Sequence, residues 1–192
     1  MARKTSLREF QQNVAQRIRD LTSQKTAASK LGFQVGTENW LVTLSDVSEV
    51  IPMPNTVAVP MTCPWFRGVA NIRGKLYSVV DFAAFQGESA IGPGTERRIV
   101  LISDRLIEGS GLMVTRMLGL RNPDQFTMQP VQSGTLDRRP WIKATYCDPG
   151  GTLWHELDVP VLVGHTQFLE VGSRAGEQRA APLAVSAASS SR

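Results

Sequence analysis

Residues 64–87 constrain the fold of this chain more than any other stretch. Two apolar runs, residues 68–72 and 76–80, lie on either side of the dipeptide Arg73-Gly74. Short β-forming runs around a dipeptide that ends in glycine are typical of a tight β-hairpin, because such a turn needs a residue with positive φ. The sequence therefore predicts two antiparallel strands here, with Arg73 and Gly74 forming the turn.

The arginine in this turn bears on function. Its guanidinium cannot be buried cheaply, so a tight turn would hold it in solvent on a rigid loop. An arginine displayed in this way could bind a carboxylate or the surface of a partner, or it could serve only to keep the loop soluble. The turn alone favours the solubilising role for Arg73.

Composition places the chain among soluble globular proteins. Apolar residues make up 42% and charged residues 20% of the 192 residues, which suits one compact domain or two small subdomains. Cys63 and Cys147 lie far apart, as expected for free thiols in a reducing compartment. Because the N-terminus lacks the apolar core of a signal peptide and no apolar run reaches membrane-spanning length, we expect a cytoplasmic protein that does not insert into a membrane.

The net charge of +4 is unevenly distributed. Residues 1–31 carry seven Lys/Arg and two Asp/Glu, and residues 172–192 carry three and one. Residues 32–171 carry eleven Lys/Arg against fourteen Asp/Glu, so the middle of the chain is slightly acidic. A nucleic-acid-binding domain would show a basic stripe on the domain itself, so this distribution disfavours that class.

An amphipathic helix is predicted within residues 1–30. Ser6 and Glu9 form a capping box ahead of apolar residues at spacings of three and four, which are Leu7, Phe10, Val14, Ile18 and Leu21. We expect the helix over about residues 6–23, followed by a polar linker. Its apolar stripe would either pack on its own domain or dock on a partner, and packing on its own domain is the commoner outcome.

From residue 31 the pattern changes to short β-like runs separated by turn-forming residues. Besides the hairpin, strands are expected at residues 31–35, 40–44, 47–51, 57–59, 98–103, 112–115, 141–147 and 153–163. Asp81 is expected to cap a short helix that ends near Gly87. Each half offers a hairpin, further strands and a short helix, so we predict a mainly β fold of two small β-barrel subdomains.

Approximate boundaries follow from this pattern. The domain spans residues 31–171, with a first barrel at about 31–86, a second at about 97–163 and a closing helix at 164–171. Residues 172–192 have almost no large apolar side chain and are expected to form a disordered tail.

We find no motif that indicates enzymatic chemistry. The chain has neither a P-loop nor a Gly-x-Ser-x-Gly nucleophile elbow, and His155 and His165 have no Cys or carboxylate at metal-ligand spacing. The aromatic residues Trp40, Phe66 and Tyr77 lie among aliphatic residues, which indicates core positions and not a base-stacking surface. We therefore expect no metal, no cofactor and a rigid β scaffold that displays charged loops, as in a binding module.

The residues around the hairpin occur in a recognisable order. They read Val59-Pro60, Pro64-Trp65-Phe66-x-Gly68-Val69-x-Asn71-Ile72-Arg73-Gly74, Leu76 and Val79-Val80-Asp81, preceded by Val47-Ser48-Glu49-Val50-Ile51. This order resembles the CheW family of chemotaxis coupling proteins, over about residues 31–171 and more strongly in the first half. Within that family it looks most like the PilI-type proteins of twitching motility.

The resemblance implies a fold of two five-stranded, SH3/OB-like β-barrels and a non-enzymatic role. A protein of this kind would join the cytoplasmic tip of a methyl-accepting chemotaxis receptor to the regulatory domain of a CheA-like histidine kinase. In the PilI-type case it would act in a chemosensory system that controls type IV pili. It would be recruited to receptor arrays at the cell pole and could self-associate weakly there.

The resemblance also implies a partner-binding surface on the first barrel. By the resemblance, Glu49 and Arg73 would lie near each other. Opposite charges on adjacent loops can orient each other and leave the arginine able to reach a partner. The residues expected to shape this surface are Glu49, Arg73, Gly74, Val47, Gly68 and Asn71.

Two other interpretations stay open. A CheW-like scaffold could serve polar localisation or pilus regulation without a kinase. A small β-barrel could also bind nucleic acid, which the slightly acidic middle of the chain disfavours.

Overall fold

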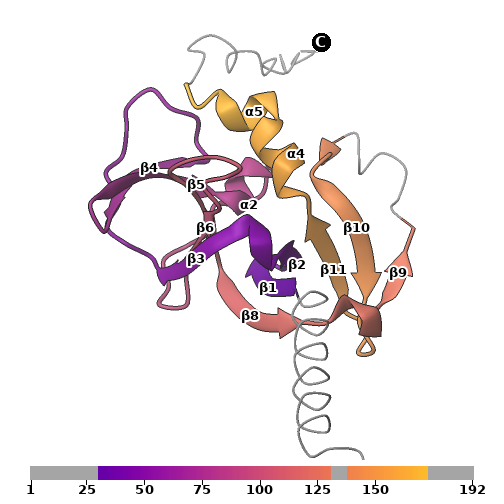
Figure 1. The fold of residues 1–192 in the computed structure, drawn as a ribbon. Helices are drawn as coiled ribbons and strands as arrows, with labels where there is room; N and C mark the ends of the chain where they lie inside the picture. The colour runs from indigo at the N-terminus through magenta and orange to yellow at the C-terminus, as the bar shows by residue number, and fades with distance from the viewer. Residues whose placement is uncertain (1–29, 131–137, 173–192) are drawn as a thin grey trace, which may run out of the picture.

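The computed structural model describes residues 30–130 and 138–172, which form a mainly β fold with a few short helices (Figure 1). The helix predicted at residues 6–23, its linker and the tail predicted beyond residue 172 lie outside the described residues. The elements are β1 (Lys30–Val35), β2 (Glu38–Thr43), η1 (Leu44–Asp46), β3 (Val47–Pro52), β4 (Phe66–Ile72), β5 (Lys75–Asp81), α2 (Phe82–Phe85), β6 (Arg98–Ile102), β7 (Ser110–Val114), β8 (Arg116–Arg121), η2 (Pro123–Gln125), β9 (Thr127–Gln129), β10 (Ile142–Cys147), β11 (Leu153–Leu157), α4 (Val159–Gly164) and α5 (Thr166–Leu169).

The strands form two sheets. One has six strands in the order β8-β1-β2-β11-β10-β9, and the other has five strands in the order β3-β6-β7-β5-β4. Neighbouring strands are antiparallel except for β2 with β11 and β5 with β7, which are parallel. The chain crosses from the six-stranded to the five-stranded sheet through η1 and returns at Thr115, between β7 and β8.

The prediction of two barrels formed by consecutive halves is corrected by this topology. In the described part of the chain neither sheet closes, because the first and last strands of each order pair with one neighbouring strand only. The sheets also exchange strands between the halves, since β1 and β2 join the C-terminal strands while β6 and β7 join β3 and β5. Alternating apolar residues show which face of a strand is buried, but they do not show which strand lies beside it.

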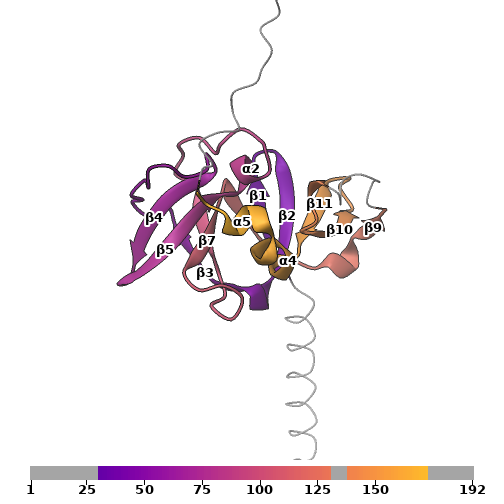
Figure 2. The ribbon, with the colours of Figure 1, turned by 90° about the horizontal axis from the view of Figure 1, so that it is seen from above.

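Aromatic side chains fill the junction between the two sheets. Phe82 and Phe85 of α2 lie 5.2 Å from Trp40 and 5.0 Å from Trp141, measured between ring centroids, and all four side chains are buried. The helices α4 and α5 lie over this junction (Figure 2), and Phe168 of α5 packs edge-on against Phe85. Such edge-on pairs fix ring geometry in addition to burying apolar area.

The predicted hairpin is present as β4 and β5. Ile72 pairs with Lys75, so Arg73 and Gly74 form a two-residue turn. Their φ values of 54° and 84° are both positive, as a type I′ turn requires. The side chain of Asn71 stabilises this turn, because its Oδ1 accepts a hydrogen bond of 2.9 Å from the N–H of Gly74.

Two other local expectations have different outcomes. Asp81 does cap α2, and its carboxylate accepts hydrogen bonds from the N–H groups of Ala84 and Ile91. The strand expected over residues 153–163 is wrong in its second half, because β11 ends at Leu157 and Asp158 then caps α4. Pro160 in the first turn of α4 favours a helix start at this point.

The sequence pattern predicts no strand between residues 115 and 141. The structure instead contains the short elements η2 and β9 there, preceded by β8, which pairs with β1 across a β-bulge between Gly32 and Phe33. These strands are short and exposed at several positions, so their apolar alternation is too weak to detect in the sequence.

Candidate partner-binding surface

Glu49 and Arg73 form an ion pair at one end of the five-stranded sheet. The Nη2 of Arg73 donates a hydrogen bond of 2.6 Å to the Oε1 of Glu49. Glu49 comes from β3 and Arg73 follows β4, and these are the two outermost strands of the sheet order. The sheet therefore curls until its edges meet through these side chains, although β3 and β4 do not pair.

The local backbone explains how both side chains reach this position. A β-bulge in β3 falls between Val47, which pairs with Ile102, and Glu49, which pairs with Leu101. A bulge of this kind adds a residue to one strand and re-aims the side chain that follows it. The type I′ turn holds Arg73 outward, and its side chain is 75% exposed against 36% for Glu49.

Further ion pairs surround Glu49 and Arg73. Lys75, next to the turn, contacts Asp104 at 2.8 Å and Glu108 at 3.1 Å, both in the loop between β6 and β7. In the same loop Arg105 contacts Asp46 of η1 at 2.6 Å. We call this group of seven charged residues the charged rim; it consists of Asp46, Glu49, Arg73, Lys75, Asp104, Arg105 and Glu108.

The rim is a preorganised surface and adds little to the stability of the fold. Exposed ion pairs contribute little to folding because water solvates and screens both charges. Their effect on each other is seen at Lys75, whose pKa is raised by hydrogen bonds with Asp104 and Glu108. The hydrogen bond from Lys75 in turn lowers the pKa of Asp104. Both groups stay charged near neutral pH, with their side chains held in place.

The six residues predicted for this surface take different positions. Arg73, Gly74 and Asn71 are exposed together at the hairpin turn. Val47 is half-buried and packs against the core. Gly68 is the exception, because it is buried and does not reach the surface.

Gly68 has a structural explanation. Its φ is +116°, and a Cβ at this position would lie 2.0 Å from the carbonyl oxygen of Val57. The segment around Val57 pairs with Val69 across the outer edge of β4. Only glycine permits this close approach of two backbones, so Gly68 shapes the hairpin edge from below.

Two groups of residues at this surface escaped sequence reasoning. The first is the carboxylates and arginine of the loop between β6 and β7, which no sequence motif marks as part of a site. The second is two exposed apolar side chains: Leu76 on β5 of the hairpin, and Val57 in the segment that pairs with Val69 of β4. Exposed apolar residues beside oriented charges are typical of protein–protein interfaces.

The described residues offer little for other kinds of site. No group of three or more His, Cys, Asp or Glu side chains among them could hold a metal ion. Cys63 and Cys147 are free thiols. No described helix has the length and apolar character needed to span a bilayer.

A family model described as a CheW-like domain matches residues 30–167. The chain belongs to the CheW-like family. This result confirms the resemblance seen around the hairpin.

Among curated proteins, Protein PilI of Pseudomonas aeruginosa is 29% identical to this CheW-like chain over 126 residues, which cover 59% of the chain and 70% of that protein. A probable chemotaxis protein CheW of Rhizobium etli is 24% identical over 111 residues, which cover 57% of the chain and 71% of that protein.

A solved structure supports the CheW-like fold. The scaffolding protein TtCheW from Thermoanaerobacter tengcongensis superposes with a TM-score of 0.60 and 17% sequence identity. The match covers 73% of this chain and 95% of the other.

Proposed function

We propose that this CheW-like chain is a non-enzymatic adaptor that joins the cytoplasmic tip of a methyl-accepting chemotaxis receptor to the regulatory domain of a CheA-like histidine kinase. The observation that carries the proposal is the charged rim, in which Arg73 is held outward by a type I′ turn and oriented by Glu49 at 2.6 Å. A preorganised charged surface of this kind favours specific binding and fast association with a partner protein.

An adaptor of this kind needs surfaces and no bond-making chemistry. Simultaneous binding of receptor and kinase raises the effective concentration of one near the other. A difference in the affinity of the adaptor for two states of the receptor can then bias the kinase. Recruitment to receptor arrays, at the cell pole in the PilI-type case, and weak self-association there belong to the same proposal.

The similarity to Protein PilI favours a chemosensory system that controls type IV pili and twitching motility. In the proposed interface Arg73 and Glu49 contact the partner, and Gly74 and Asn71 keep the turn in shape. Val47 supports Glu49 from the core side. Gly68 acts indirectly, through the backbone packing of the hairpin edge.

The proposal is tested by calorimetric titration of the chain with two fragments, the regulatory domain of the cognate kinase and a receptor tip. We expect binding to both fragments at micromolar dissociation constants, on the order of those of transient signalling complexes. Arg73→Glu places like charges beside Glu49 and should weaken binding of at least one fragment by about tenfold or more. The fold should persist, because the change lies in an exposed turn.

Arg116→Glu is the matched control, because Arg116 is exposed on β8 in the other sheet. It changes the net charge equally and should leave both affinities within about twofold. The double variant Glu49→Arg/Arg73→Glu re-forms the pair with its charges exchanged. If Arg73→Glu and Arg116→Glu weaken binding equally, the effect is one of net charge, and the rim is not the interface.

Binding to neither fragment would contradict the proposed coupling. A scaffold that regulates pili without a kinase would then be the better explanation of the CheW-like fold.

A further inference from the structure

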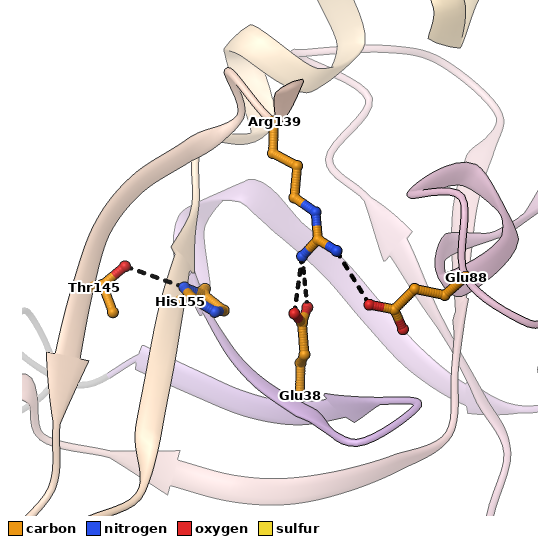
Figure 3. Close-up of polar contacts among 5 residues, drawn as sticks. All are labelled: Glu38, Glu88, Arg139, Thr145 and His155. Atoms are coloured by element: carbon orange, nitrogen blue, oxygen red, sulfur yellow. Dashed lines mark hydrogen bonds and ion pairs between the residues drawn. The ribbon is translucent and has the colours of Figure 1, made fainter. Parts of the chain in front are cut away.

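Away from the charged rim, one arginine is held between two carboxylates (Figure 3). The Nη1 of Arg139 donates to both carboxylate oxygens of Glu38, at 2.9 and 2.8 Å. Its Nη2 donates to the Oε1 of Glu88 at 3.1 Å. We call Glu38, Glu88 and Arg139 the junction clamp. The guanidinium is the only side chain that offers several donors in a planar, fixed geometry, which suits it to bind two carboxylates at once.

The three residues of the clamp come from different parts of the fold. Glu38 opens β2 of the six-stranded sheet, and Arg139 lies in the segment that leads into β10 of the same sheet. Glu88 follows α2, in the connection between β5 and β6 of the five-stranded sheet. The bonds to Glu38 therefore anchor the guanidinium within one sheet, and the bond to Glu88 crosses to the other.

The clamp is more sheltered than the ion pairs of the rim. The side chains of Arg139, Glu38 and Glu88 are 22%, 25% and 29% exposed. Lower solvent access strengthens charged hydrogen bonds relative to exposed pairs. The β1–β2 turn leaves room for Glu88, because a Cβ on Gly36 would lie 3.0 Å from the Oε2 of that carboxylate.

Aromatic contacts and hydrogen bonds accompany the clamp at this junction. The N–H of Gly36 donates to the Oγ1 of Thr115 at 3.0 Å, and the Nε2 of Gln167 donates to the carbonyl of Phe85 at 3.2 Å. Trp40 meets Phe82, and Trp141 meets Phe85, across the same boundary between the sheets. Burial of these aromatic rings is non-directional in its main driving force, whereas the guanidinium makes three charged hydrogen bonds, each of which requires a narrow range of donor and acceptor positions. The clamp therefore adds a charged, directional constraint on the angle between the sheets.

A single strand connects the clamp with the charged rim. β2 begins at Glu38 and ends at Thr43, and η1 then presents Asp46 to Arg105 of the rim. Immediately beyond η1, β3 carries Glu49. A change in the angle between the two sheets at the clamp would therefore move the rim relative to the six-stranded sheet.

We propose that Arg139 is a positioning residue, which holds Glu88 while anchored by Glu38 and so fixes the relative orientation of the two sheets. The consequence for signalling rests on the proposed adaptor function. If one partner binds the charged rim and the other binds the six-stranded sheet, a bias passes between them only while the sheets keep a defined geometry. The fixed orientation itself does not depend on that function.

The orientation is measured by double electron–electron resonance between two nitroxide labels, one on each sheet. Exposed Arg67 of β4 and exposed Thr127 of β9 are changed to cysteine in a Cys63→Ser/Cys147→Ser background. We expect one narrow distance distribution for the parent protein. Glu88→Gln removes the negative charge that accepts the hydrogen bond from Arg139, and it should broaden or shift the distance distribution. Arg139→Gln should do so at least as strongly.

Matched variants separate positioning from general loss of structure. Arg138→Gln removes the exposed neighbouring arginine and should leave the distribution unchanged. Arg139→Lys keeps the charge but loses the planar fork, so it should behave like Arg139→Gln. If Glu88→Gln and Arg139→Gln variants that unfold cooperatively keep the parent distribution, Arg139 does not position the sheets.

A second measurement tests the signalling consequence. In Glu88→Gln, the separate affinities for the kinase domain and the receptor fragment should stay within about threefold, while binding of one should no longer alter the affinity for the other. Unchanged cooperativity despite a broadened distribution would overturn this consequence. If neither fragment binds the parent protein, the proposed function fails, and the resonance experiment still decides the role of Arg139.

Discussion

At the scale of single residues, backbone geometry accounts for positions that composition cannot explain. Gly68 lies at φ +116° under the carbonyl of Val57, where a side chain has no room. Arg73 also has a positive φ, which is uncommon for a residue with a Cβ, and the hydrogen bond that the N–H of Gly74 donates to Asn71 holds the turn in this conformation. The local strain lies at the turn that displays the guanidinium.

Gly68→Ala should destabilise the fold by about 2–4 kcal/mol, through backbone strain and the clash with Val57. Chemical denaturation measures the difference. Gly92→Ala is the control, since Gly92 has no positive φ and a methyl group added there would meet no atom within 4 Å, and it should change stability by less than about 0.5 kcal/mol. Equal effects of the two substitutions would contradict the explanation by close approach.

His155 predicts a pH dependence. Its ring packs on Trp40 at 5.2 Å and its Nδ1 lies 3.1 Å from the Oγ1 of Thr145. Burial lowers the pKa of His155, while the charge of Glu38 opposes that shift and the charge of Arg139 reinforces it. The folded state therefore favours the neutral ring, and below about pH 6.5 the unfolded state binds a proton more readily.

The contribution of His155 to the free energy of unfolding should accordingly be fully present above about pH 6.5. It should fall as the pH decreases from there toward the lowered pKa of the folded state. His155→Gln should reduce this loss. Urea unfolding of both proteins between about pH 8 and pH 5.5 measures it, in a window above the titration of ordinary carboxyl groups. Parallel pH profiles for the parent and His155→Gln would show that His155 titrates alike in the folded and unfolded states.

At the scale of elements, the structure depends on caps that join neighbouring segments. α2 has only four residues, so it has little stability of its own. The buried carboxylate of Asp81 accepts from Ala84 within α2 and from Ile91 in the following loop, at 3.2 and 3.0 Å. One side chain thus fixes both the start of the helix and the path of the chain toward β6.

Asp81→Ala should cost about 2–4 kcal/mol, because it removes a cap and leaves a buried N–H without its partner. Asp158→Ala, at the corresponding position of α4, removes a single cap bond to Val161 and should cost about 1 kcal/mol. Thermal or urea unfolding compares the two. A loss at Asp158 as large as that at Asp81 would show that the bond to Ile91 contributes little.

At the scale of the whole molecule, each sheet takes strands from both halves of the chain. The parallel pairing of β2 with β11 and of β5 with β7 interlocks the halves. Neither half can therefore complete a sheet alone, and a protein of this topology should unfold as one cooperative unit over the described residues.

Division of the chain at Gly92, in the exposed loop before β6, tests this topology. Each fragment alone should lack cooperative unfolding and near-ultraviolet circular dichroism, because its strands have lost their partners. A mixture of the two fragments should recover both signals. Two independently folded fragments would instead support autonomous halves, as the two-barrel prediction from sequence implied.

The sequence by itself determined what depends on near neighbours. The hairpin of β4 and β5, the turn at Arg73-Gly74 and the cap at Asp81 follow from the conformational limits of residues close together in the chain. The proximity of Glu49 and Arg73 did not follow from their spacing, and was predicted only through the family resemblance.

Only the tertiary structure decided which strands pair and which distant charges meet. Arg139 and Glu88 are 51 residues apart, and Lys75 and Asp104 are 29 apart, yet both pairs form hydrogen bonds. The alternation of apolar residues determines which face of each strand is buried, but the choice of neighbouring strand depends on how the complete set of buried faces packs together. For this reason the two interlocked open sheets, and the clamp between them, became visible only in the folded chain.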